Sequence, residues 1–218
     1  MAGKQSAGEK VPVYLDVEIK HTVPPWEVGS LLDDAGQVLA NQDEGALVGG
    51  PRFEQLFRAT GFMKVGEQEF PIDGGGLRVR RTGVRRLGTF RGHCWQSALF
   101  PSGAGFGFLT FPARDDGKPT LNEGFVFTGD GQLVPARVIE VPWLKHKIPN
   151  GENVSAILES ELGRAVISAE SVLSVFHPMP IGAGAGFVLQ QAIVRYSLNG
   201  ESAHGMMERS TDISLMAE

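Results

Sequence analysis

The stretch "FVLQQAIVRYSLNGESAHGMMERSTDI" at residues 187–213 holds the pattern that decides the fold. Two runs rich in apolar and β-branched residues, 187–198 and 203–213, flank the four residues "NGES". An Asn-Gly pair supplies the positive φ angles that a tight hairpin turn requires. The stretch therefore predicts two antiparallel strands joined by a short turn.

The same pattern recurs along the chain. Residues 52–65 and 68–81 flank a turn at "VGEQ", and residues 123–129 and 132–141 flank "GDGQ". Residues 153–176 contain good helix formers, but their second half alternates with period two, which favours a hairpin around "ELGR" over a helix. With 29 glycines and 13 prolines, the chain keeps no long helical stripe. Hairpins in series predict an all-β antiparallel meander, which hides its edges by closing into a barrel or folding as a sandwich.

The chain divides into three parts. Residues 1–10 are small, polar and charged, which predicts a disordered tail and no signal peptide. Residues 11–51 contain a strand at 11–23, with apolar residues at every second position, and then a linking segment with a short helix or a loop. Residues 52–218 are expected to form the barrel, as one compact unit with 11–51. The open edge of the N-terminal segment leaves a homodimer as one option.

Composition excludes several classes of protein. The 218 residues are 42% hydrophobic, as in a soluble globular protein, and no apolar run approaches the roughly 18 residues of a membrane span. A single cysteine, Cys94, excludes an internal disulfide and fits a cytoplasmic location. Twenty basic and 25 acidic side chains give a net charge of -5, which argues against a nucleic-acid binder.

The sequence predicts no cofactor and no metal. The glycine-rich stretches 102–108 and 181–187 have phenylalanine where the dinucleotide motif G-x-G-x-x-G needs its last glycine. The five histidines show no metal-ligand spacing, and the nucleophile elbow G-x-S-x-G is absent. His93 and Cys94 are neighbours on a strand and point to opposite faces, so Cys94 is expected to be a buried apolar residue and no nucleophile.

The second informative stretch is "RVRRTGVRRLGTFRGHCW" at 78–95, with six arginines in its first fourteen residues. It lacks the interleaved aromatic residues that stack on bases. On a strand, Arg91, His93 and Trp95 share one face, and Met206 and Glu208 share a face of another strand. Charged groups at mid-strand are costly inside a protein unless they are paired. Either these faces are solvated or ion-paired, or they line a pocket for a hydrophobic molecule.

The segments "RFEQLFRATGFMKVGEQEFPIDGGGLRVRRTGVRR", "RGHCWQSALFPSG" and "HGMMERS" resemble a family of lipocalin-like proteins related to AttH and carotenoid hydratases. The resemblance covers roughly Arg52 to Ser210. In that family an F-E-Q-like element leads to a G-x-G-x-R-D-[HR]-S-W-G-x-R stretch, and the chain closes on a G-x-x-E-R-S strand. The matching positions here are Gly76, Arg78, Arg81, Arg85 or Arg86 in the first motif and Gly205, Glu208, Arg209 and Ser210 in the second.

The resemblance implies a lipocalin-like β-barrel with a reduced N-terminal β portion, and cofactor-free chemistry on large hydrophobic molecules. Val79 stands where the family has aspartate, and Thr82-Gly83 stand near its Ser-Trp, so the acid role of that aspartate does not carry over. The chain is also shorter than the usual two-barrel members.

These observations predict a cofactor-independent lyase, hydratase or isomerase that acts on a hydrophobic, aromatic or isoprenoid-like molecule in a barrel pocket. Glu54, His93 or Glu208 would act as the base, and Arg78 or Arg81 would stabilise a developing anion. Arg91, Trp95 and Met206 would bind the substrate. A carrier that binds such a molecule without converting it is the alternative, and a filled barrel that serves as an interaction module is a third.

Overall fold

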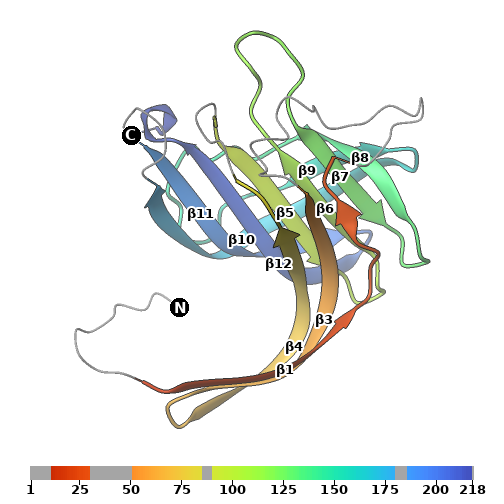
Figure 1. The fold of residues 1–218 in the computed structure, drawn as a ribbon, viewed down its shortest axis with the longest axis vertical. Helices are drawn as coiled ribbons and strands as arrows, with labels where there is room; N and C mark the ends of the chain where they lie inside the picture. Colours follow the sequence, from red (N-terminus) through yellow and green to blue (C-terminus); the bar gives the residue numbers. More distant parts are fainter. Residues whose placement is uncertain (1–10, 30–50, 85–89, 180–185, 218) are drawn as a thin grey trace.

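The fold was obtained as a computed structural model, which describes residues 11–29, 51–84, 90–179 and 186–217. Eight antiparallel strands close into a barrel in the order β10-β11-β12-β5-β6-β7-β8-β9 (Figure 1). The strands are β5 (His93–Leu99), β6 (Gly105–Thr110), β7 (Asn122–Phe127), β8 (Leu133–Glu140), β9 (Ala156–Ser160), β10 (Gly163–Met179), β11 (Phe187–Leu198) and β12 (Glu201–Asp212). A 3-10 helix, η2 (Ile213–Leu215), follows the last strand. The predicted all-β meander that closes into a barrel is confirmed.

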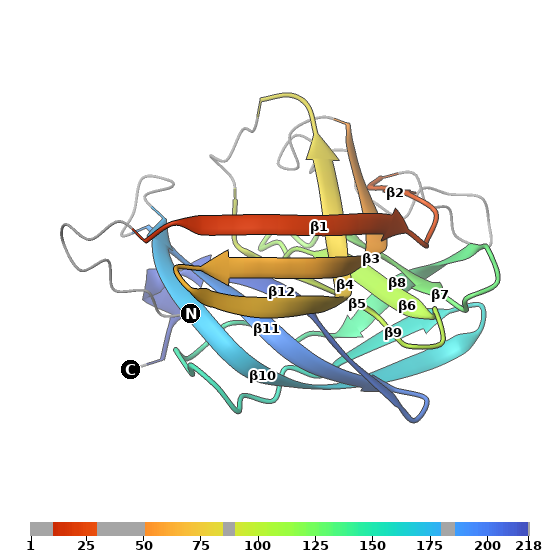
Figure 2. The same ribbon diagram turned by 90° about the horizontal axis from the view of Figure 1, so that it is seen from below.

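The N-terminal strands form a second, four-stranded sheet. Its strands are β1 (Val13–His21), β2 (Trp26–Glu27), β3 (Arg52–Val65) and β4 (Gln68–Arg81). β1 and β2 pair with β3, and β4 pairs with β3 as well. Figure 2, the view from below, shows β1, β3 and β4 side by side in front of the barrel. The barrel that the sequence predicts from residue 52 onward starts at His93 in the structure, because among the described strands β3 pairs with β1, β2 and β4, and β4 pairs only with β3.

The predicted hairpins form where the turn residues placed them. Asn199 and Gly200 join β11 to β12 with φ angles of 51° and 83°. The ambiguous segment 153–176 forms the β9–β10 hairpin, with Gly163 at a φ of 93°, and its helical alternative does not form. The expected tail at 1–10, most of the linking segment 24–51 and the stretch 181–185 lie outside the described residues.

Side chains fill the interior of the barrel. Alternate residues of the barrel strands point inward and pack into one core, in keeping with the period-two geometry of strands. Its buried members are Cys94, Ala98, Phe100, Phe106, Phe108, Ala136, Val138, Val154, Ala156, Leu158, Ile167, Ala169, Val194, Tyr196, Leu198 and Met207. For the part of the chain described, the interior is thus a packed core, where the sequence predicts a ligand pocket.

Cys94 lies in this core, and we expect its thiol to be inert in the folded protein. The side chain is fully buried, and burial raises the pKa of the thiol to about 12. Because only the thiolate reacts readily, a colorimetric thiol reagent at pH 8 should label no cysteine in the native protein and one cysteine per chain in denaturant. Rapid labelling of the native protein would contradict this burial.

One charged side chain, Arg209, is also buried in the barrel. Its Nε donates to Gln190 Oε1 at 2.8 Å, its Nη1 donates to the Pro142 carbonyl at 2.6 Å, and its Nη2 donates to Glu152 Oε2 at 2.6 Å. The resemblance placed Arg209 in the closing motif of the family. Its bonds here join β11 and β12 to the segment that links β8 and β9, so its role in this fold is structural.

A second core joins the N-terminal sheet to the outer wall of the barrel. Figure 1 shows β3 and β4 passing the barrel beside β5 and β12 and then running away from it with β1. Val23, Trp26 and Leu56 of the sheet pack on Leu99, Leu109, Phe111, Leu121, Phe125 and Phe127 of the barrel. Among the described residues there is no helix long and apolar enough to cross a membrane.

Candidate functional site

Five side chains, which we call the charged cluster, meet where the N-terminal sheet lies against the barrel wall. They are Arg52 and Glu54 of β3, His93 and Trp95 of β5, and Glu208 of β12. The register of β5 and β12 sets Trp95 opposite Glu208 and His93 opposite Ser210. Since directly opposite residues share one face of a sheet, these four side chains all project from the outer wall of the barrel.

Arg52, Glu54 and Trp95 form the inner half of the charged cluster. Arg52 Nη2 lies 2.6 Å from Glu54 Oε1, and the Trp95 indole N–H donates to Glu54 Oε2 at 2.9 Å. The Arg52 guanidinium also lies over the Trp95 ring, 4.6 Å from its centroid. Glu54 is only 1% exposed, and burial raises its pKa, although Arg52 and the Trp95 hydrogen bond act in the opposite direction. Glu54 thus holds the Arg52 charge against the aromatic ring.

His93 and Glu208 form the outer half, with Ser210 behind them. His93 Nε2 lies 3.1 Å from Glu208 Oε1, and His93 Nδ1 lies 2.7 Å from the Ser210 hydroxyl. The amide of Gln191 donates to the other carboxylate oxygen of Glu208 at 2.8 Å. The imidazole is therefore fixed between a hydroxyl and a carboxylate, the arrangement that orients a histidine for proton transfer.

The two carboxyl groups of the charged cluster have pKa values shifted in opposite directions. Burial alone would raise the pKa of Glu208, but the hydrogen bond and charge of His93, the Gln191 hydrogen bond and the Arg52 charge together bring it below its ordinary value. Burial dominates at Glu54, and its pKa is raised. Opposite shifts in neighbouring carboxyl groups are typical of sites that divide acid and base roles between them.

We expect Glu208→Gln to destabilise the fold at neutral pH and to have no such effect in acid. The variant lacks the charged hydrogen bonds that the carboxylate makes with His93 and Gln191. We therefore expect the free energy of unfolding to fall by about 1 to 3 kcal/mol near pH 7. Since the folded-state pKa of Glu208 is lowered, its stabilisation is present above the unfolded-state pKa and disappears as pH falls through the folded-state pKa. Urea unfolding of both proteins from pH 7 to pH 3 measures the difference. A difference that stayed constant with pH would contradict an ionised Glu208 in the folded protein.

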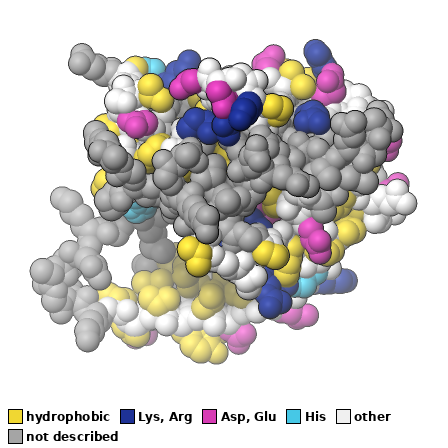
Figure 3. All heavy atoms as spheres, turned by 45° about the horizontal axis from the view of Figure 1, so that its top comes forward, with side chains coloured by type: hydrophobic (Ala, Val, Ile, Leu, Met, Phe, Trp, Pro, Cys, Tyr) yellow, Lys and Arg dark blue, Asp and Glu magenta, His cyan; other side chains and the backbone are white. Residues whose placement is uncertain are grey.

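An apolar groove leads away from Glu208 along the barrel wall. Two adjoining hollows of about 280 and 300 Å³ share Ile193 and Met206. The first runs between Gly75–Leu77 of β4 and Ser97–Leu99 of β5, and the second is lined by Leu173 and Val175 of β10 and reaches Glu208. Figure 3 shows hydrophobic side chains gathered in a recess between the N-terminal sheet and the barrel. The groove offers an apolar surface that ends at the charged cluster.

The structure brings together most of the site residues predicted from the sequence. Glu54, His93, Trp95 and Glu208 belong to the charged cluster, and Met206 lies in the apolar groove. Arg81 stands opposite Arg52 in the β3–β4 register. Burial and, to a smaller extent, repulsion by Arg52 lower the pKa of Arg81, which places its charge near that of Arg52.

Two predicted residues lie elsewhere. Arg78 is on the face of β4 that points away from the barrel, with its guanidinium carbon 5.0 Å from the centroid of the Phe53 ring. Strand alternation explains this position, since Leu77 and Arg81 take the barrel-facing side. Arg91 donates to the Pro112 carbonyl at 3.1 Å and to the Thr120 hydroxyl at 3.2 Å, and so helps to fix the loop between β6 and β7.

Several members of the site were missed at the level of sequence. The sequence identifies Arg52 only as the start of a strand, and no sequence pattern points to Gln191. Ser210 was visible in the family-like closing motif but had no assigned role. A second indole–carboxylate contact, from Trp26 to the fully buried Glu123 at 2.7 Å, lies close enough for the Glu123 charge to raise the pKa of Glu54. No spacing rule joins residues 26 and 123.

The charged cluster offers acid–base groups and no metal-binding set. Across the described ranges, no three His, Cys, Asp or Glu side chains converge in a way that could hold a metal ion. What the arrangement supplies is a carboxylate and an imidazole in contact, a guanidinium, and an aromatic wall at the end of an apolar groove.

No protein-family model matches the sequence, and no curated protein does. The fold, however, is similar to two solved structures. A Nitrosomonas europaea protein named as a candidate AttH shares 13% of its sequence, with a TM-score of 0.55 over 92% of this chain. Kievitone hydratase from Nectria haematococca shares 12%, with a TM-score of 0.47 over 93% of this chain. This chain spans 62% of the length of each of them. The first of these two structures confirms the resemblance for the fold, which is the lipocalin-like fold of AttH-type proteins.

Proposed function

We propose that the protein is a cofactor-independent enzyme, a lyase, hydratase or isomerase, that uses acid–base chemistry on a hydrophobic small molecule. The observation that carries the proposal is the His93–Glu208 pair at the end of the apolar groove. A reacting group placed there would meet a proton acceptor, while its apolar part would lie along Ile193 and Met206. The resemblance of the sequence motifs to those of carotenoid hydratases also supports a reaction of this class.

In this proposal Glu208 and His93 act together as the base. The lowered pKa keeps Glu208 ionised at neutral pH, so its carboxylate, which borders the groove, can take up the substrate proton and share it with His93 Nε2 across the 3.1 Å contact. Ser210 holds the other ring nitrogen and so fixes the ring plane. Each proton removed from the substrate would thus have a defined acceptor in the His93–Glu208 pair.

The negative charge that develops on the substrate would be stabilised by Arg52, with Arg81 as a second cation. Arg52 is already held by Glu54 and by the Trp95 ring, so its guanidinium needs no reorganisation during the reaction. Arg81 replaces Arg78 in this role because only Arg81 shares the face of Arg52. Trp95 would form the wall of the reacting end.

The test is a conversion assay with hydrophobic molecules that carry a conjugated double bond, such as aromatic enones and polyisoprenoids. Mass spectrometry detects the gain or loss of one water, and chromatography detects isomers. We expect Glu208→Gln to bind a substrate without converting it. Glu170→Gln, which removes an exposed carboxylate of β10, is the matched control and should convert it as the wild type does. Equal conversion by Glu208→Gln would remove this pair from the mechanism.

A carrier function is the second candidate, and the apolar lining of the groove favours it. Leu173, Val175, Ile193 and Met206 could hold a hydrophobic molecule without any chemistry. Binding by the wild type with no conversion, and loss of that binding in Met206→Lys, would support the carrier. If Met206→Lys bound as tightly as the wild type, the groove would be excluded for both functions.

A further inference from the structure

Two arginines of the sequence motif, Arg78 and Arg80, have no part in the charged cluster. Both lie on the face of β4 that points away from the barrel, because even-numbered residues of β4 alternate with Leu77, Val79 and Arg81. In the register, Arg80 stands opposite Phe53 and Arg78 stands opposite Gln55. The Arg78 guanidinium therefore lies 5.0 Å from the centroid of the Phe53 ring, and Arg80 is the residue directly opposite Phe53 on the neighbouring strand.

Within the described part of the chain, neither arginine has a carboxylate partner. The ion pairs of this region are Arg52 with Glu54 and Lys64 with Glu69, and both leave Arg78 and Arg80 out. Both arginines are exposed. Two like charges on one sheet face repel each other, so an anion bound there would lower the electrostatic energy of the sheet.

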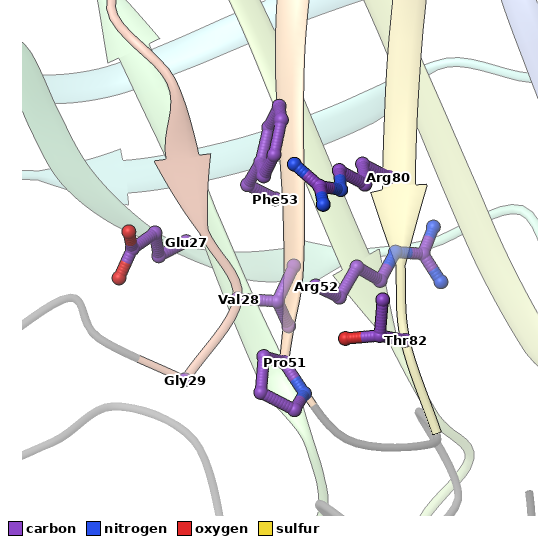
Figure 4. Close-up of a pocket in the computed structure, with 8 residues that line it drawn as sticks. All are labelled: Glu27, Val28, Gly29, Pro51, Arg52, Phe53, Arg80 and Thr82. Carbon is purple, nitrogen blue, oxygen red and sulfur yellow. The ribbon is translucent and has the colours of Figure 1, made fainter. Parts of the chain in front are cut away.

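A pocket of about 410 Å³ lies next to Arg80 (Figure 4). Phe53, Val28 and Pro51 give it an apolar wall, and its polar lining residues are Glu27, Arg52, Arg80 and Thr82. Figure 4 shows the Arg80 guanidinium directed towards Phe53, while the Glu27 carboxylate points away from it. The volume suits one or two aromatic rings, since ligand pockets measure about 300 to 1,000 Å³.

This outer pocket, defined by Phe53, Arg80 and Thr82, is separate from the charged cluster. Arg52 lines it, but its side chain leaves towards the other face of the sheet, where it meets Glu54 and Trp95. A ligand in the outer pocket would therefore contact neither His93 nor Glu208. Its binding can be measured without any knowledge of the reaction.

We propose that the outer pocket binds a planar aromatic carboxylate. The ring would pack against Phe53, and the carboxylate would accept two parallel hydrogen bonds from the planar fork of Arg80. A singly charged carboxylate matches the Arg80 guanidinium, because the other lining arginine, Arg52, is already paired with Glu54. The Thr82 hydroxyl is a further donor. Arg78 adds long-range attraction from the same face, and it leaves less of the Phe53 ring open to water.

The test is isothermal titration calorimetry of the full chain with 2-naphthoate, 2-naphthamide and inorganic phosphate. We expect 2-naphthoate to bind, 2-naphthamide to bind at least roughly tenfold more weakly, and phosphate not to displace 2-naphthoate, since a charged bidentate pair and ring burial act together. Binding of the acid and the amide with equal affinity, or no binding of 2-naphthoate, would overturn the proposal. Displacement by phosphate would reduce the pocket to a simple anion site and overturn it as well.

Variants locate the binding. Arg80→Gln should weaken 2-naphthoate at least roughly tenfold, and Arg80→Lys should recover only part of the loss because it lacks the planar fork. Arg164→Gln, which removes an exposed arginine of β10, should leave the affinity unchanged. Glu208→Gln should also bind 2-naphthoate as the wild type does. Binding in the outer pocket is therefore tested separately from the proposed activity. Equal affinity in Arg80→Gln would place the ligand elsewhere and contradict the proposal.

Discussion

Replacing Arg209 with methionine is expected to lower the free energy of unfolding by about 3 to 5 kcal/mol, because the change breaks a buried ion pair by removing one partner. The guanidinium donates to Glu152, Gln190 and the Pro142 carbonyl, and methionine can donate to none of them. Gln190 is fully buried, and the side chain of Glu152 is only 14% exposed, so neither recovers its lost bond easily from water.

Urea unfolding followed by circular dichroism measures this loss. Arg195→Met is the matched control, because Arg195 pairs with Glu170 on the exposed face of the barrel, where such pairs contribute at most about 1 kcal/mol. The double variant Arg209→Met with Glu152→Gln should recover part of the loss, since it removes the unpaired carboxylate. A loss below about 1 kcal/mol in the single variant would show that the buried network does not hold the barrel.

With a substrate in hand, His93→Ala is expected to lower kcat by about 10² to 10⁴, the usual contribution of a positioned acid–base group. KM should change little, because the apolar groove that binds the substrate is lined by other residues. This difference between kcat and KM separates a role in proton transfer from a role in binding. Steady-state kinetics measures both parameters. The control His177→Ala, which removes an exposed histidine, should have the kcat and KM of the wild type.

The pH profile of the residual activity provides a second readout. Burial, the largest influence on Glu208, is offset in the wild type mainly by His93. Removing the imidazole should therefore raise the pKa of Glu208, and the pH below which activity falls should move upwards. An unchanged kcat, or a fall in kcat with no shift of the acid limb, would mean that His93 and Glu208 do not act as a pair.

The hairpins could be predicted from the sequence, but the way they assemble could not. Turn residues such as Asn199 and Gly200 act over a few positions, so their consequence is local and readable. The barrel closes without β3 and β4 because β12 pairs with β5, and this pairing joins strands that are far apart in the sequence. No residue of the "VGEQ" turn carries that information, because its own hairpin is the same in either arrangement.

The alternation of side chains along each strand correctly predicted which site residues share a face, but it did not predict which face points into the barrel. His93 and Trp95 share one face of β5, as expected, yet the buried Cys94 and Ala98 share the other. A strand with one solvated face shows its inner side by polarity. β5 has a core on each side, so polarity gave no answer. The same ambiguity hid Arg52, whose partner Trp95 belongs to the other sheet.

The position of β5 between two cores also determines how the molecule can open. Cys94 and Ala98 anchor this strand in the barrel, while Leu99 and Trp95 anchor it against the N-terminal sheet. Detaching the sheet would expose only one side of β5, and its backbone amides would stay paired with β6 and β12. Amide hydrogens of β5 should therefore exchange with solvent only when the whole barrel unfolds, whereas β1, largely exposed, should exchange through local fluctuations. The strand that carries His93 and Trp95 would thus be among the last parts of the molecule to lose its shape.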